Sequence, residues 1–143
     1  MSMFARFMKK NKKVRENTTY AATASLTDES GKPLEWTIRA VTTKEDEHIR
    51  DACTAEVPVK GKPNLFRPKL DTTKYMTQLA VAAIVEPNLY DKELQDSYGV
   101  FSPEELLKEM IDSPSEYQDL LLFIQRYSGF DNSMDEKVDE AKN

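Results

Sequence analysis

The 143-residue sequence is poor in the residues that carry most nucleophilic and metal chemistry. It contains one histidine, one cysteine and four glycines. A single cysteine cannot form an internal disulfide, so nothing indicates a secreted disulfide scaffold. His48 and Cys53 would diverge by about 140° on a helix, which excludes a Cys–His dyad. We expect Cys53 to be a small buried side chain, and the sequence predicts no catalytic residue, no metal ligand and no cofactor.

Long apolar runs and phosphate-binding glycine motifs are also missing. The longest apolar run, residues 79–85, has seven residues, far short of the ~20 that a membrane-spanning helix needs. The chain has neither G-x-x-x-x-G-K-[ST], nor G-x-G-x-x-G, nor the G-x-S-x-G of serine hydrolases. We therefore expect a soluble cytoplasmic protein that is not an enzyme. A hydrolytic function would require the fold to bring two carboxylates together, which the sequence alone does not exclude.

Charge is distributed unevenly along the chain. Residues 1–15 contain six bases and no acid, residues 131–143 contain five acids and two lysines, and the remainder has a net charge of −8. An acidic body repels phosphate backbones and argues against a nucleic-acid-binding core, although the basic segment could still contact RNA or an acidic surface. We divide the chain into a basic N-terminal arm with a short helix (1–18), a single domain (19–131) and an acidic tail that we expect to be flexible (132–143).

Alternating side chains predict a β-hairpin with strands at about 19–26 and 34–42. Leu34, Trp36 and Ile38 then share the face that packs under a later helix. The segment between the strands has a turn composition that includes a glycine. Small residues should oppose large ones, in the register Leu26–Leu34, Ala24–Trp36 and Ala22–Ile38.

Capping residues predict helices that cover this hairpin. A buried central helix should run from about residue 72 to 86, because its second half is apolar almost all round. Residues 57–70 hold three prolines and should leave the core, with a second short hairpin as one possibility. The other expected helices are a short amphipathic one at 3–13, one capped by Thr42 or Thr43, one at 91–98, and two opened by Ser102-Pro103 and Ser113-Pro114, the last ending at Gly129. The predicted fold class is α+β: a mainly α-helical single domain with an N-terminal β-hairpin packed on the helices.

Three aromatic residues stand out between residues 87 and 101. Tyr90, Tyr98 and Phe101 lie among polar residues in a short, turn-rich stretch, a composition typical of recognition surfaces. They could also form the outer shell of the core at a corner between helices. Because leucines of the neighbouring helices already supply a core, we predict that the three aromatics bind a partner.

Several short sequence motifs follow one another in a specific order. They are Gly31-Lys-Pro-Leu-Glu-Trp-Thr-Ile-Arg39, Pro87-Asn-Leu-Tyr-Asp-Lys-Glu-Leu-Gln-Asp-Ser-Tyr-Gly-Val100, Glu104-Glu-Leu-Leu-Lys108 and Gly129-Phe-Asp131. Together they resemble the XkdN-like family of phage tail assembly chaperones, from about Phe7 to Asp131. The basic first dozen residues and the tail after Asp131 do not match the family pattern.

The resemblance implies a non-catalytic protein of a phage or prophage tail module. It would bind the tape-measure protein before the tail tube polymerises, act in the cytoplasm of the bacterial host, and be absent from the mature virion. The tail-tube protein and a longer frameshifted form of the chain are further candidate partners, and self-association stays open; neither a membrane nor a nucleic acid is expected as a partner. The alternative function is a small regulatory or nucleic-acid-binding phage protein acting through the basic N-terminal arm.

Overall fold

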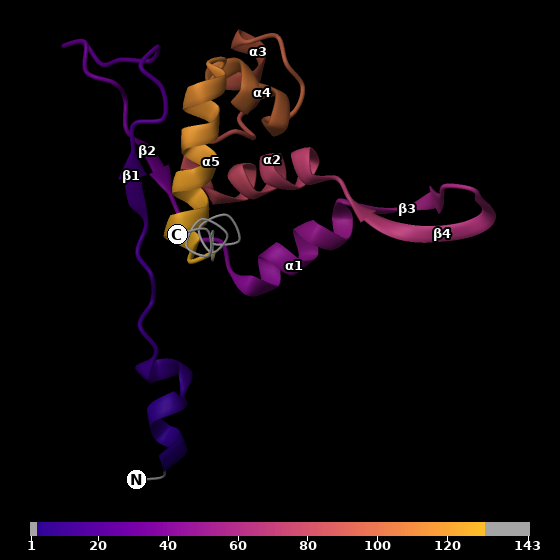
Figure 1. Ribbon diagram of the computed structural model, residues 1–143. Helices are drawn as coiled ribbons and strands as arrows, with labels where there is room; N and C mark the ends of the chain where they lie inside the picture. The colour runs from indigo at the N-terminus through magenta and orange to yellow at the C-terminus, as the bar shows by residue number, and fades with distance from the viewer. Residues whose placement is uncertain (1–2, 131–143) are drawn as a thin grey trace, which may run out of the picture.

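The computed structural model describes residues 3–130, in which a small antiparallel sheet lies along one side of a group of helices (Figure 1). Strands β1 (Thr18–Tyr20), β2 (Trp36–Ile38) and β5 (Ile84–Glu86) form this sheet in the order β1-β2-β5. Trp36 and Ile38 are buried beneath the helices. The predicted α+β, mainly helical fold class is confirmed.

Five α-helices begin at the residues that their capping signals indicate. Each N-cap side chain accepts a hydrogen bond from the backbone N–H three residues later, and the caps are Thr42, Asp71, Asp91, Ser102 and Ser113. The helices are α1 (Thr43–Ala52), α2 (Thr72–Ala83), α3 (Lys92–Ser97), α4 (Pro103–Met110) and α5 (Pro114–Ser128). Gly129 ends α5 in the left-handed conformation, with a φ of 85°.

Helix α2 is the centre of the domain, because it packs against α1, α4 and α5. Its buried residues point in nearly every direction around the axis, as expected of a core helix. The helix ends at Ala83 rather than at residue 86. The next three residues form β5, which pairs with β2, and Pro87 follows them. A residue before proline favours extended backbone, so this end of the predicted helix becomes a third strand.

The predicted hairpin exists, but its strands are shorter and its register is correct only near the turn. The Leu34 N–H donates to the Leu26 carbonyl at 2.9 Å, as predicted. Farther from the turn, Tyr20 and not Ala24 is opposite Trp36. Residues 21–25 bulge from the strand between these two points. Leu34 is 44% exposed, so its predicted place in the core is wrong.

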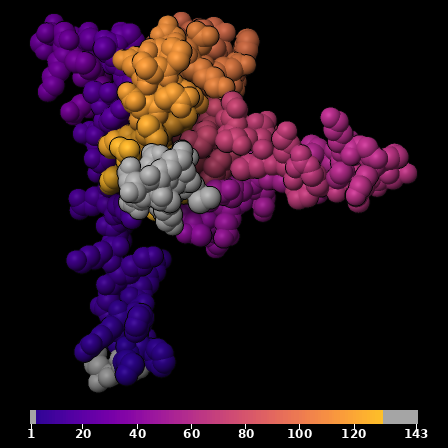
Figure 2. All heavy atoms as spheres, in the orientation of Figure 1, coloured from indigo at the N-terminus to yellow at the C-terminus, as the bar shows by residue number. Residues whose placement is uncertain are grey.

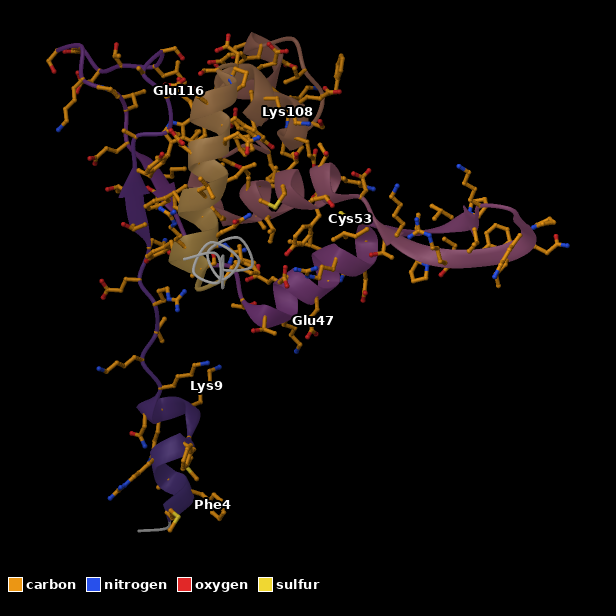
Figure 3. The ribbon with its side chains drawn as sticks, in the orientation of Figure 1. Phe4, Lys9, Glu47, Cys53, Lys108 and Glu116 are labelled. Carbon is orange, nitrogen blue, oxygen red and sulfur yellow. The ribbon has the colours of Figure 1, made fainter. Side chains whose placement is uncertain are left out.

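The bulge is held by Glu116 of α5, whose carboxylate accepts two hydrogen bonds from it. One comes from the Thr23 hydroxyl at 2.8 Å and the other from the Ala24 N–H at 2.8 Å. Figure 3 shows Glu116 near the start of α5. The bonds hold the bulged segment against the helix, which accounts for the change of register.

A second hairpin projects from the body, in the region where the sequence predicts an excursion (Figures 1 and 2). Strands β3 (Thr54–Val59) and β4 (Lys62–Leu70) pair only with each other. At the base, the Asp71 N–H donates to the Cys53 carbonyl at 2.8 Å, and the Cys53 side chain is buried as expected. We call this hairpin, residues 54–70, the β-arm.

The N-terminal segment also stands apart from the body (Figure 1). It contains two 3₁₀ turns, Met3–Phe7 and Lys9–Asn11, in place of the predicted amphipathic helix. An isolated helix of this length is only marginally stable without a packing surface. We call residues 3–17 the N-terminal arm; at the end where it joins the body, the Arg15 guanidinium donates to the Tyr127 carbonyl near the C-terminus of α5. The acidic tail at 132–143 lies outside the described residues.

Candidate partner-binding surfaces

The segment that carries the three candidate aromatics, residues 87–101, is fixed at both ends. We call it the corner segment. Leu89 and Val100 are buried and anchor it to the core. The Asn88 side-chain oxygen accepts the Tyr90 N–H at 3.1 Å, and the Gln95 amide donates to the Leu89 carbonyl at 2.8 Å. The corner segment is therefore held by local hydrogen bonds in a turn followed by α3.

The three candidate aromatic side chains differ in their exposure to solvent. Tyr90 is 69% exposed and Phe101 is 89% exposed, so neither ring serves the core. Tyr98 is half-buried and packs against the core. Exposed aromatic rings on a fixed turn offer a large contact area at little cost in conformational entropy, which suits them to bind another protein.

Two further apolar surfaces were not predicted as sites. On the β-arm, Leu65 and Phe66 are 49% and 57% exposed. On the N-terminal arm, the exposed apolar residues include Met3, Phe7 and Met8. Apolar residues next to runs of bases were a usable signal in both segments, but sequence alone does not show that the segments stand free of the body.

Glu45 has a structural role at the start of α1. It completes a reciprocal capping box with Thr42 at the start of α1. It also forms a two-point pair with Arg39, one bond of which, from a guanidinium N–H to Oε1, measures 2.9 Å. The hydrogen bond from Arg39 is the main cause that lowers the pKa of Glu45 to about 2. His48 is exposed.

Tyr75, the buried tyrosine of α2, contacts two side chains of α1. The Tyr75 hydroxyl donates to Asp46 of α1, and the Arg50 guanidinium lies 4.6 Å from the centre of the Tyr75 ring. Burial, followed by the hydrogen bond to Asp46, raises the pKa of Tyr75 to about 12. These three residues tie α1 to α2, and a phenol with so high a pKa is a poor proton donor or nucleophile near neutral pH.

One hollow between described helices is lined by two carboxylates, and each of them has a partner within the chain. A hollow of about 320 Å³ between α2 and α4 contains both Asp71 and Glu104, with Lys74 and Lys108 beside them. Asp71 caps α2, and Glu104 accepts a hydrogen bond from Gln78 at 2.8 Å. Within residues 3–130, no group of three or more His, Cys, Asp or Glu side chains is placed to hold a metal ion. No helix in this part of the chain is long and apolar enough to cross a membrane.

Comparison with known proteins gives one consistent result. The model of the family described as "Phage XkdN-like tail assembly chaperone protein, TAC" matches residues 4–142. The match includes most of the basic N-terminus and the acidic tail, so our expectation that these parts lie outside the family pattern is wrong.

Two relatives come from Bacillus subtilis (strain 168). The chain is 28% identical to the uncharacterized protein YqbN over 116 residues, which is 81% of this chain and 76% of YqbN. It is 23% identical to the phage-like element PBSX protein XkdN over 116 residues, 81% of this chain and 77% of XkdN. The crystal structure of YqbN has the same fold, with a TM-score of 0.75 and 21% identity over 92% of this chain and 99% of that one. The chain belongs to the XkdN-like family of phage tail assembly chaperones.

Proposed function

We propose that this chaperone is non-catalytic and binds the tape-measure protein before tail-tube subunits polymerise around it. It would act in the cytoplasm of the bacterial host and be absent from the mature virion. Membership of the family supports a role in tail assembly. The observation that carries the choice of a protein partner is the pair of exposed rings, Tyr90 and Phe101, on a corner segment fixed by Leu89 and Val100.

The physical properties of a tape-measure protein fit such a surface. A long, mainly helical chain exposes apolar stripes until the tube covers it, and exposed aromatic side chains can cover such a stripe. Further candidate partners are the tail-tube protein, a longer frameshifted form of this chain, and a second copy. We retain the division into a basic N-terminal segment (1–18), a chaperone domain (19–131) and an acidic tail (132–143) as part of the proposal.

The test is co-purification of the tagged chaperone with co-expressed tape-measure protein, followed by measured affinities. Replacing both Tyr90 and Phe101 with alanine should weaken binding by about 1–3 kcal/mol for each ring and leave the melting temperature almost unchanged. A matched control replaces Val85 and Leu122, which are also exposed but lie elsewhere. Tyr98→Ala should instead lower the melting temperature, because this ring packs against the core.

One result would contradict the proposed binding site, and another would contradict the proposed partner. Full binding by the folded Tyr90/Phe101 double variant would remove the corner segment as the site. No binding by the wild-type chain would remove the tape-measure protein as the partner.

The exposed basic N-terminal arm keeps one alternative function open, binding of nucleic acid by a small regulatory phage protein. Six bases and no acid lie in residues 1–15. That function predicts an affinity for duplex DNA or RNA that falls steeply with salt and is lost when the arm is removed.

A further inference from the structure

The β-arm carries charge opposite to that of the helical body. Residues 54–70 contain four bases and one acid, whereas residues 71–130 contain eleven acids and four bases. All four bases of the arm are exposed: Lys60, Lys62, Arg67 and Lys69. The arm nevertheless extends away from the acidic body instead of folding onto it (Figure 2). Its positive charge is thus presented to another molecule.

The register of the arm places Phe66 on one face and two of the bases, Arg67 and Lys69, on the other. Residues directly opposite in an antiparallel pair share a face. Phe66 is opposite Pro58, and Pro68 and Leu70 lie on the same face as Phe66, together with their partners Glu56 and Thr54. Arg67 and Lys69 alternate with these residues and lie on the other face. Because the ribbon is only two strands wide, their long side chains can reach around its edges.

The edges of the arm are poorly suited to pair with an added strand. Pro58, Pro63 and Pro68 have no backbone N–H, and Asn64 has a φ of 70°, which interrupts the regular strand. Proline on an edge strand is a common protection against strand addition. The partner is therefore expected to dock on a side-chain face, and an amphipathic helix provides a matching apolar stripe.

Three acids of the helical body already form hydrogen bonds within the chain. Glu105 accepts the Phe101 N–H at 3.2 Å, and Glu104 accepts the Gln78 amide at 2.8 Å. Glu116 holds Thr23 and Ala24 of the bulged segment, and its pKa is lowered mainly by the hydrogen bond from Ala24. These three carboxylates are therefore less available to the basic arm of a second copy.

We propose that the β-arm binds an acidic amphipathic helix of the tape-measure protein. The apolar stripe of that helix packs on the face that contains Phe66, and its flanking carboxylates pair with the bases of the arm. This inference rests on the proposed function, because it names the kind of segment that the arm holds. The backbone hydrogen bond between Cys53 and Asp71 closes the base of the arm, where Figure 3 shows Cys53.

The experiment reverses the charge of the arm in the full chain. The variant is Lys62→Glu/Arg67→Glu/Lys69→Glu. A matched control makes the same change in net charge on the N-terminal arm, Lys9→Glu/Lys10→Glu/Lys12→Glu. Affinity for purified tape-measure protein is measured at several salt concentrations. The β-arm variant should bind at least about ten-fold more weakly at low salt, with a flatter salt dependence, because it has lost complementary charge.

A second variant tests the apolar face. Phe66→Ser, at an exposed position on the arm, should weaken binding without changing the melting temperature or flattening the salt dependence. The control on the N-terminal arm should bind nearly as well as wild type. Equal weakening by the two charge-reversal variants would assign the effect to net charge and overturn the inference.

The remaining outcomes distinguish this inference from the proposed function. If the wild type does not bind the tape-measure protein, both are overturned. If it binds and both β-arm variants bind equally well, only the inference is overturned. The same holds if the charge reversal leaves tape-measure binding intact and instead abolishes self-association in sedimentation, or abolishes binding to duplex DNA.

Discussion

Replacing Trp36 with alanine should cause one of the largest losses of stability available to this chain. Trp36 is 2% exposed and is among the largest fully buried side chains, so its removal leaves a cavity where β2 meets the helices. Truncations of this kind cost about 3–5 kcal/mol. A typical domain has only ~5–15 kcal/mol of stability, so the loss is a large fraction of the total. For a chain of this size the melting temperature should fall by about 10–20 °C.

Leu34 provides the matched control, because it precedes Trp36 by two residues and has the same alternation phase. It is 44% exposed. Leu34→Ala should therefore cost only ~1 kcal/mol, about half the value of burying a leucine completely. Both variants are compared by far-UV circular dichroism during thermal and urea unfolding. Fluorescence cannot serve, because Trp36 is the only tryptophan.

The comparison can refute the structural argument in two ways. Equal losses for Trp36→Ala and Leu34→Ala would mean that the strand buries both residues, as simple alternation suggests. A loss below about 1 kcal/mol for Trp36→Ala would mean that this ring is not part of a close-packed core.

Three further predictions concern acid stability and the termini. The pKa of Glu45 is lowered from 4.5 to about 2, mainly by the hydrogen bond from Arg39, so its contribution should be complete above pH 4.5 and lost as the pH falls toward 2. After allowance for solvent screening of this half-exposed pair, the contribution is about 1 kcal/mol, and Arg39→Ala should remove it in pH-dependent melting. The pKa of Glu116 is likewise lowered, by Ala24 first and then by Thr23, so Glu116→Gln should lower the melting temperature at neutral pH and reduce the loss of stability on acidification. A chain cut to residues 9–131 should keep one cooperative unfolding transition in calorimetry, and loss of cooperativity would show that the removed termini contribute to the core.

The starts of the helices could be predicted because capping is a local interaction. Thr42, Asp91 and Ser102 each accept a hydrogen bond from a backbone N–H three residues later, so cap and helix are close in sequence. Gly129 likewise ends α5 through its own backbone conformation. Signals that act over three or four residues are readable without a fold.

The register of the first hairpin and the end of α2 could not be predicted, because distant residues decide them. Glu116 holds Thr23, which is 93 positions earlier in the chain. Strand β5 forms because β2 offers Ile84 a partner, although the apolar composition of residues 79–85 suits a helix as well. Local propensity leaves such choices open, and tertiary contacts decide them.

The candidate site was partly accessible from composition. Aromatic residues among polar ones indicated the corner segment, but the pattern could not separate the exposed Tyr90 and Phe101 from the half-buried Tyr98. Phe66 was missed, because a proline-rich excursion gives no information about which side chains another molecule can reach. Exposure is a property of the whole fold, so composition can indicate a surface without assigning its residues.

The separation of the exposed surfaces favours several weak contacts over one tight one. The corner segment and the β-arm extend from different parts of one small core (Figure 1). A long helical partner can touch more than one of them, and linked contacts raise the overall affinity well above that of each alone. Such a complex also comes apart stepwise, because a competitor displaces one contact at a time. Under the proposed function, in which the chaperone holds the tape-measure protein and then yields it to polymerising tube subunits, we expect several weak contacts to serve better than a single deep site.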